Sequence, residues 1–68
     1  MDNNIKYYVA WDDNSNSVYV PKDNRAKPSF DHYGALAFDS ADEAKDYAIE
    51  NVYWKWWIED SEGEIYTS

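Results

Sequence analysis

Carboxylate and tryptophan side chains are concentrated in the second half of this 68-residue sequence. Nine of its 14 acidic residues and three of its four tryptophans lie between residues 38 and 66. Carboxylates attract cationic groups, and tryptophan and tyrosine are the residues that most often dominate the energy of protein interfaces. This combination of residue types indicates binding to a basic partner rather than catalysis.

Groups that could carry out catalysis or hold a metal are scarce. The chain has one histidine, His32, no cysteine and two glycines, so it offers no evident nucleophile–base pair and no glycine-rich phosphate loop. The stretch from Asp12 to Asp23 spaces its oxygen ligands partly like a calcium loop, but Ser17 stands where that loop requires glycine. We therefore expect no enzyme activity, no cofactor and no metal ion.

The overall charge limits the partners further. Fourteen acidic residues against six basic ones give a net charge of −8. Direct binding to nucleic acid or to an anionic membrane depends on lysine and arginine, so both are disfavoured. The first residues are polar, and no apolar run approaches the roughly 20 residues that span a bilayer. We expect a cytoplasmic protein that binds neither nucleic acid nor membrane.

The elements that position these groups can be predicted from local patterns. Residues 5–11 alternate between apolar and other side chains, which is typical of a strand. Six turn-forming residues follow at 12–17, and the β pattern resumes at 18–20 before Pro21 ends it. This order predicts a β-hairpin.

The sequence predicts that a helix starts at Ser40. Ser40 and Glu43 have the spacing of a capping box, in which each side chain bonds the other residue's backbone N–H. Ala44 and Ala48 lie on one face of the following helix and would allow close packing on a sheet. An aromatic strand from residue 52 or 53 to 59, a turn at 60–63 and a return strand at 64–66 complete the chain. The sequence thus predicts one α+β domain over residues 1–68, in ββ-loop-α-ββ order, with one helix packed on one face of a small antiparallel sheet.

Two groups of carboxylates are the first candidate binding surface. One group begins at the helix start and continues on the side of the helix away from the alanines; the other surrounds the last turn. Regularly spaced carboxylates can be offered to a basic groove as phosphates would be, although a merely solvated polar surface explains each group as well. The residues concerned are Asp39, Asp42, Glu43, Asp46 and Glu50 in the first group, and Glu59, Asp60, Glu62 and Glu64 in the second.

The rings of the predicted aromatic strand are the second candidate. With one helix covering one side of the sheet, one face of this strand should stay open, beside Tyr8 and Tyr19. We expect Tyr53 and Trp57 on that open face, with Trp54 and Trp56 as the alternative pair. A further alternative is that the loop at 22–33 folds over these rings and covers them.

The end of the chain also carries a short resemblance. Residues 58–64 read I-E-D-S-E-G-E, which is similar to the terminal hairpin of the phage uracil-DNA glycosylase inhibitors, with their I-x-D-S-x-G-E pattern. The resemblance covers seven residues, and no binding residue of those inhibitors is carried over to this chain. Size, acidity and predicted element order are likewise similar to small phage proteins that block host polymerase, restriction or CRISPR complexes. The resemblance implies an inhibitor that mimics DNA.

Together these observations predict a small acidic inhibitor, a monomer or homodimer, that binds a basic and nucleic-acid-handling host or defence protein. In this reading the carboxylates supply the electrostatic surface, and Tyr53 and Trp57 supply the apolar anchor. The alternative is a protein- or carbohydrate-binding module that uses an exposed aromatic sheet face, with its acidity serving solubility.

Overall fold

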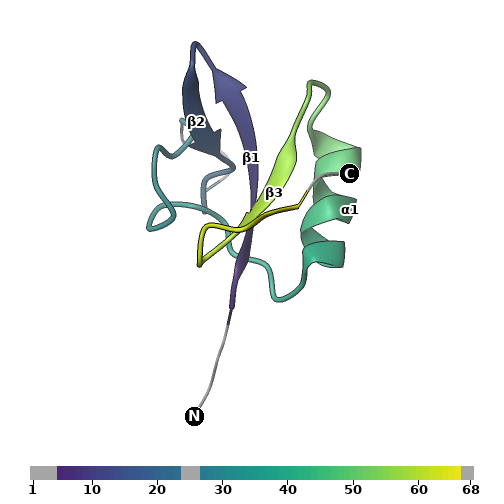
Figure 1. Cartoon of the computed structure of the whole chain (residues 1–68). Helices are drawn as coiled ribbons and strands as arrows, with labels where there is room; N and C mark the ends of the chain where they lie inside the picture. The colour runs from purple at the N-terminus through teal and green to yellow at the C-terminus, as the bar shows by residue number, and fades with distance from the viewer. Residues whose placement is uncertain (1–4, 24–26, 67–68) are drawn as a thin grey trace.

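A computed structural model describes residues 5–23 and 27–66 of the chain. Its elements, in order, are β1 (Tyr7–Asp13), β2 (Asn16–Tyr19), α1 (Ala41–Asn51), β3 (Trp57–Asp60) and β4 (Ile65–Tyr66). The strands form one antiparallel sheet in the order β2-β1-β3-β4, and α1 lies against one face of it (Figure 1). The predicted α+β class and element order are confirmed.

The first hairpin closes through a two-residue turn at Asn14 and Ser15. Both residues have positive φ angles, 54° and 71°, as a type I′ turn requires, and Asp13 pairs with Asn16 directly beside them. The polar stretch predicted as a turn is therefore mostly strand, because the register of β1 and β2 continues through it. As a result β1 reaches well beyond the first residue of β3.

The start of α1 confirms the cap predicted at Ser40. The Ser40 hydroxyl accepts the backbone N–H of Glu43 at 3.2 Å. The Glu43 carboxylate, however, accepts the N–H of Asp39 at 3.3 Å, and not that of Ser40. Both bonds satisfy donors at the helix entrance, and the two acids of the first turn, Asp42 and Glu43, lie where the helix dipole favours negative charge.

The main core lies between α1 and the sheet. Val9 of β1 pairs with Ile58 of β3, and the two side chains are 0% and 1% exposed. Ala44 and Ala48 pack against them without exposure, because an alanine face lets the helix backbone approach the sheet closely. Within the described residues, no helix is long and apolar enough to cross a membrane.

The opposite face of the sheet is covered, contrary to the expectation that it stays open. Tyr8 and Tyr19 are only 8% and 7% exposed. The segment after residue 27 is tied to this region by paired backbone hydrogen bonds between Tyr19 and Ser29, at 2.8 and 3.0 Å. His32 then stacks on Tyr8, with ring centroids 4.4 Å apart and planes 16° apart. The alternative of a covering loop is therefore correct for Tyr8 and Tyr19, but Tyr53 stays 86% exposed; residues 24–26 of the loop lie outside the described part.

The aromatic strand is shorter than predicted. It begins at Trp57, whereas residues 52–56 form a connection from the helix that bends at Trp54. Val52 still belongs to the helix end, since its backbone N–H bonds the carbonyl of Ala48 at 2.9 Å and its side chain is 7% exposed. The chain needs the next few residues to cross from the helix layer to the sheet.

Candidate functional site

The carboxylates of α1 form one exposed surface, as predicted. Four acidic side chains occupy an arc of roughly 100° around the helix axis at 3.6 residues per turn, opposite the buried Ala44 and Ala48. All four residues are exposed, and none of their carboxylates forms an ion pair with a residue that the structure describes. We call this the α1 acidic surface; its members are Asp42, Glu43, Asp46 and Glu50.

Asp39 stands apart from that surface. Its side chain is 79% exposed but forms an ion pair with the ammonium group of Lys6. The hydrogen bond to Asp39, together with the attraction of its charge, raises the pKa of Lys6. The charge of Asp39 is thus partly compensated within the molecule, which weakens it as a contact for a cationic partner.

Asp60 is the clearest correction to the predicted second acidic group. It is 2% exposed, and its carboxylate accepts the backbone N–H groups of Glu62 and Glu64, each at 2.9 Å. The hydroxyl of Tyr66 donates a third bond at 3.0 Å. Burial opposes ionisation of Asp60, but the donated hydrogen bonds outweigh it and lower the pKa of the carboxyl group. Asp60 organises the turn and is not available to a partner.

The neighbours of Asp60 in the seven-residue motif also have local roles. Ser61 donates its backbone N–H to the Lys6 carbonyl at 2.8 Å and accepts the Lys6 N–H on its hydroxyl at 3.2 Å. Gly63 has a φ of 90°, which suits glycine and closes the turn. Asp60, Ser61 and Gly63 of this motif therefore build the hairpin, while Glu62 and Glu64 remain exposed.

Glu59 is a second correction. Its side chain is only 16% exposed, because alternation along β3 places it on the covered face of the sheet. One carboxylate oxygen accepts the Tyr19 hydroxyl at 2.9 Å, and the other lies 3.4 Å from Nε2 of His32. Burial, followed by the bond to Glu59, raises the pKa of Tyr19 to about 12. Glu59 helps to fasten the covering segment and is not a free surface charge.

Tyr53 and Trp57 do not form the predicted pair on an open face. Tyr53 is 86% exposed in the connection after α1, four residues along the chain from the exposed Ile49. Trp57 packs against the buried Tyr8, Ala10, Tyr19 and Ala35. Its indole Nε1 is buried without a hydrogen-bond partner in the part of the chain that the structure describes. Of the predicted pair, Tyr53 alone is an exposed ring.

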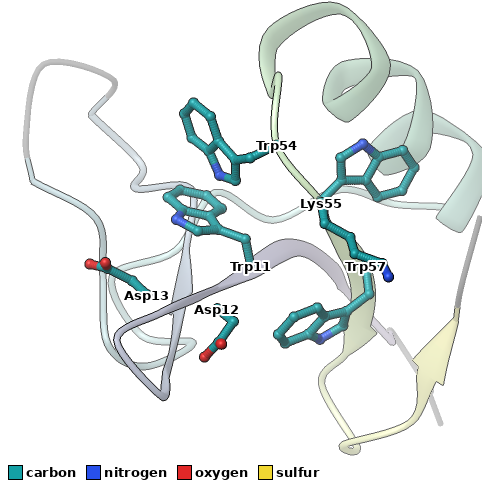
Figure 2. Close-up of a pocket in the computed structure, with 7 residues that line it drawn as sticks. Trp11, Asp12, Asp13, Trp54, Lys55 and Trp57 are labelled. Atoms are coloured by element: carbon teal, nitrogen blue, oxygen red, sulfur yellow. The ribbon is translucent and has the colours of Figure 1, made fainter.

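A cleft lined by all four tryptophans is the feature that sequence reasoning missed (Figure 2). It has a volume of about 690 Å³. The rings of Trp11 and Trp54 meet edge to face in its wall, with centroids 5.6 Å apart and planes 70° apart. Trp56 and Trp57 complete the aromatic lining, and Asp12, Asp13 and Lys55 add charged groups. We call this the tryptophan cleft.

The residues that line this cleft are evident in the sequence, but no local pattern shows that they come together. The sequence pattern places Trp11 at a strand end and the two aspartates after it in a turn, far in sequence from the other three tryptophans. Only the β1–β3 pairing, with Ala10 opposite Trp57, brings the two stretches together. Comparison with known proteins found no matching family model, no matching curated protein and no matching solved structure.

Proposed function

We propose that this protein is a non-catalytic inhibitor that binds a basic, nucleic-acid-handling protein in the cytoplasm and occupies the surface where nucleic acid would bind. The observation that carries the proposal is the α1 acidic surface. Its carboxylates are exposed, lie on one side of a single helix and have no ion-pair partner among the described residues. A rigid helix presents them in fixed positions, as a nucleic-acid backbone presents phosphates.

The spacing of the carboxylates supports mimicry. Asp42, Asp46 and Glu50 follow one another at intervals of four residues, so they lie about 6 Å apart along the helix axis. One strand of DNA carries a charge about every 3.4 Å along its axis, so the helix offers a sparser array of the same sign. The net charge of −8 adds a long-range field that steers a basic partner towards the molecule.

An apolar anchor lies beside this surface. Ile49 and Tyr53 are 61% and 86% exposed, four residues apart, where α1 ends next to Glu50. Exposed aromatic and aliphatic groups next to a charged array supply the desolvated contacts that hold an interface after electrostatic encounter. Trp57, which is packed in the protein, does not belong to this anchor. The likeness of the chain to small phage inhibitors, in size and acidity, points the same way.

The test is a comparison of two variants with the same change of charge. The first, Asp42→Asn/Asp46→Asn/Glu50→Gln, neutralises the α1 acidic surface and spares Glu43, whose carboxylate serves the cap. The control, Asp23→Asn/Glu62→Gln/Glu64→Gln, removes three exposed charges outside both the α1 acidic surface and the tryptophan cleft. Tagged proteins are used to capture partners from a host lysate, with elution by salt compared with elution by detergent.

The proposal expects proteins that bind nucleic acid to be captured and to elute in salt. It also expects the captured partner, once purified, to lose its nucleic acid when this protein is added. The helix variant should bind at least tenfold more weakly at low salt, and the control variant should bind nearly as the native chain does. Equal binding by the helix variant and the native protein would remove the α1 acidic surface from the proposal.

A second candidate function is an interaction module that uses aromatic side chains, with acidity serving solubility. The open sheet face expected for such a module is covered, but the tryptophan cleft gives the idea a different location. Partner capture that resists salt and fails with Trp54→Ala would favour this candidate, for either a protein or a carbohydrate ligand. Trp54 is the appropriate position because it is 52% exposed and lies outside the strands.

A further inference from the structure

The tryptophan cleft lies where the sheet changes from three strands to two. Residues 7–10 of β1 pair with β3, but Trp11, Asp12 and Asp13 have strand partners on β2 alone. The connection that carries Trp54 and Lys55 passes on the other side of the cleft (Figure 2). A short length of strand edge is therefore left beside a hollow lined with indole rings.

The backbone of Asp12 faces that edge. In an antiparallel strand, the N–H and C=O groups of alternate residues point to opposite sides. Tyr7 exchanges backbone bonds with Phe38, and Val9 accepts the Val20 N–H, both on the β2 side of β1. Lys6 accepts the Ser61 N–H on the β3 side, so the even-numbered residues, and with them Asp12, turn their backbone groups towards the cleft. An added strand could pair there.

The rings of the cleft suit a cation. Trp11 and Trp54 meet at 70°, so a group in the corner between them touches the face of one ring and the edge of the other. Tryptophan is the aromatic side chain that attracts cations most strongly through its ring face, and guanidinium groups also stack on it. A neutral sugar can stack on such rings as well, so the rings alone do not choose between the two.

The charges beside the rings favour a cation over a neutral sugar. Asp12 and Asp13 are exposed and lie on the cleft wall, where their carboxylates favour a positive ligand and repel phosphate. Lys55 also lines the cleft, but in Figure 2 its amino group points away from both aspartates. The cleft thus combines indole faces, carboxylates and a strand edge, the three features that an arginine side chain in an extended peptide can use together.

We propose that the tryptophan cleft binds an arginine-bearing extended segment of a protein partner, which pairs with the β1 edge at Asp12. Alternate side chains of such a segment face opposite sides of the sheet. One side offers the corner of Trp11 and Trp54, and the other offers Trp57 and Asp12. This site is separate from the α1 acidic surface and does not depend on the inhibitor function proposed above.

The protein carries its own reporter for a test, because all four of its tryptophans line the cleft. The probe is a capped five-residue peptide with a central arginine between valine and threonine residues, titrated while tryptophan fluorescence is recorded. The matched peptide has citrulline, a neutral analogue, in place of arginine. We expect saturable binding of the arginine peptide and at least tenfold weaker binding of the citrulline peptide.

Two pairs of protein variants locate the site. Asp12→Asn/Asp13→Asn should weaken binding about tenfold, whereas Asp42→Asn/Asp46→Asn, with the same change of charge, should alter it less than twofold. Trp54→Ala should weaken binding about three- to tenfold. Thermal unfolding of each variant verifies that it is folded, and the asparagine variants retain the size of the native side chains in case Trp54→Ala does not fold.

Several results would overturn the proposal. These are the absence of a saturable fluorescence change with the arginine peptide, equal binding of the citrulline peptide, or an equal loss in the two double variants. The last result would show general attraction to an acidic protein. A saturable response to a glucose oligosaccharide in place of the arginine peptide would assign the cleft to a carbohydrate instead.

Discussion

The hydroxyl of Tyr66 donates a hydrogen bond to Oδ2 of Asp60 at 3.0 Å, and it completes a ring of donors around a carboxylate that is 2% exposed. The other donors are the backbone N–H groups of Glu62 and Glu64, both on Oδ1. One side chain therefore fixes the turn between β3 and β4 and holds the short last strand to the sheet. A residue predicted to serve a partner instead serves the fold.

Asp60→Asn should lower the thermal unfolding midpoint by roughly 5–10 °C, because an amide cannot accept bonds from donors on both of its ends. The measurement is circular dichroism on heating at neutral pH. Glu62→Gln is the control and should leave the midpoint almost unchanged, since the exposed side chain of Glu62 has no part in the ring of donors. The stabilising contribution of Asp60 is present above its unfolded pKa, near 3.8, and is lost as the pH falls through the lower pKa of the folded state. A native-like midpoint for Asp60→Asn at neutral pH would contradict this assignment.

Alkaline solution should destabilise the protein between about pH 10 and pH 12. The bond to Asp60, followed by burial, raises the pKa of Tyr66 to about 12, and burial with the bond to Glu59 raises the pKa of Tyr19 to about 12. The unfolded chain releases these protons near its ordinary pKa of 10.0, so stability is complete below that pH and declines above it. Tyrosinate absorbance and urea unfolding at pH 9 and pH 11 measure the effect. Tyr66→Phe should reduce the decline, whereas Tyr53→Phe, at an exposed position, should not.

Ser15→Gly should stabilise the protein by about 0.5–1 kcal/mol, because Ser15 has a φ of 71° and glycine adopts that angle without steric cost. Urea unfolding at neutral pH provides the measurement. The matched control is Ser17→Gly, at an exposed position in β2 without a positive φ, where added backbone freedom should destabilise the protein. Stabilisation by both substitutions, or by neither, would be inconsistent with a type I′ turn at Asn14 and Ser15.

His32→Ala should loosen the segment that covers the second face of the sheet. The imidazole stacks on Tyr8 and meets Tyr19 edge to face with centroids 4.9 Å apart, so its removal should cost about 0.5–1.5 kcal/mol. Faster hydrogen exchange is expected at the Tyr19 N–H, which bonds the Ser29 carbonyl. Phe30→Ala, in the same segment but 72% exposed, is the control and should change neither quantity by much. Native exchange at Tyr19 in the His32 variant would show that the strand pairing alone holds the cover.

The sequence by itself determined the features that depend on near neighbours. Alternation predicted the first hairpin, the Ser40–Glu43 spacing predicted the helix entrance, and the alanine face predicted which side of α1 is buried. The exposed side of the helix followed from the same periodicity. Each of these signals acts within one or two turns of the chain, so the residues concerned carry the information themselves.

Only the tertiary structure decided where the rings and the remaining acids lie. Placing β1 between β2 and β3 brings Trp11 to Trp54, turns Glu59 under the covering segment and leaves a strand edge at Asp12. Burial of Asp60 depends on the return of β4, and cover for Tyr8 depends on His32. These outcomes depend on strand order and register, which join residues far apart in the chain, and a local pattern of residue types cannot specify them.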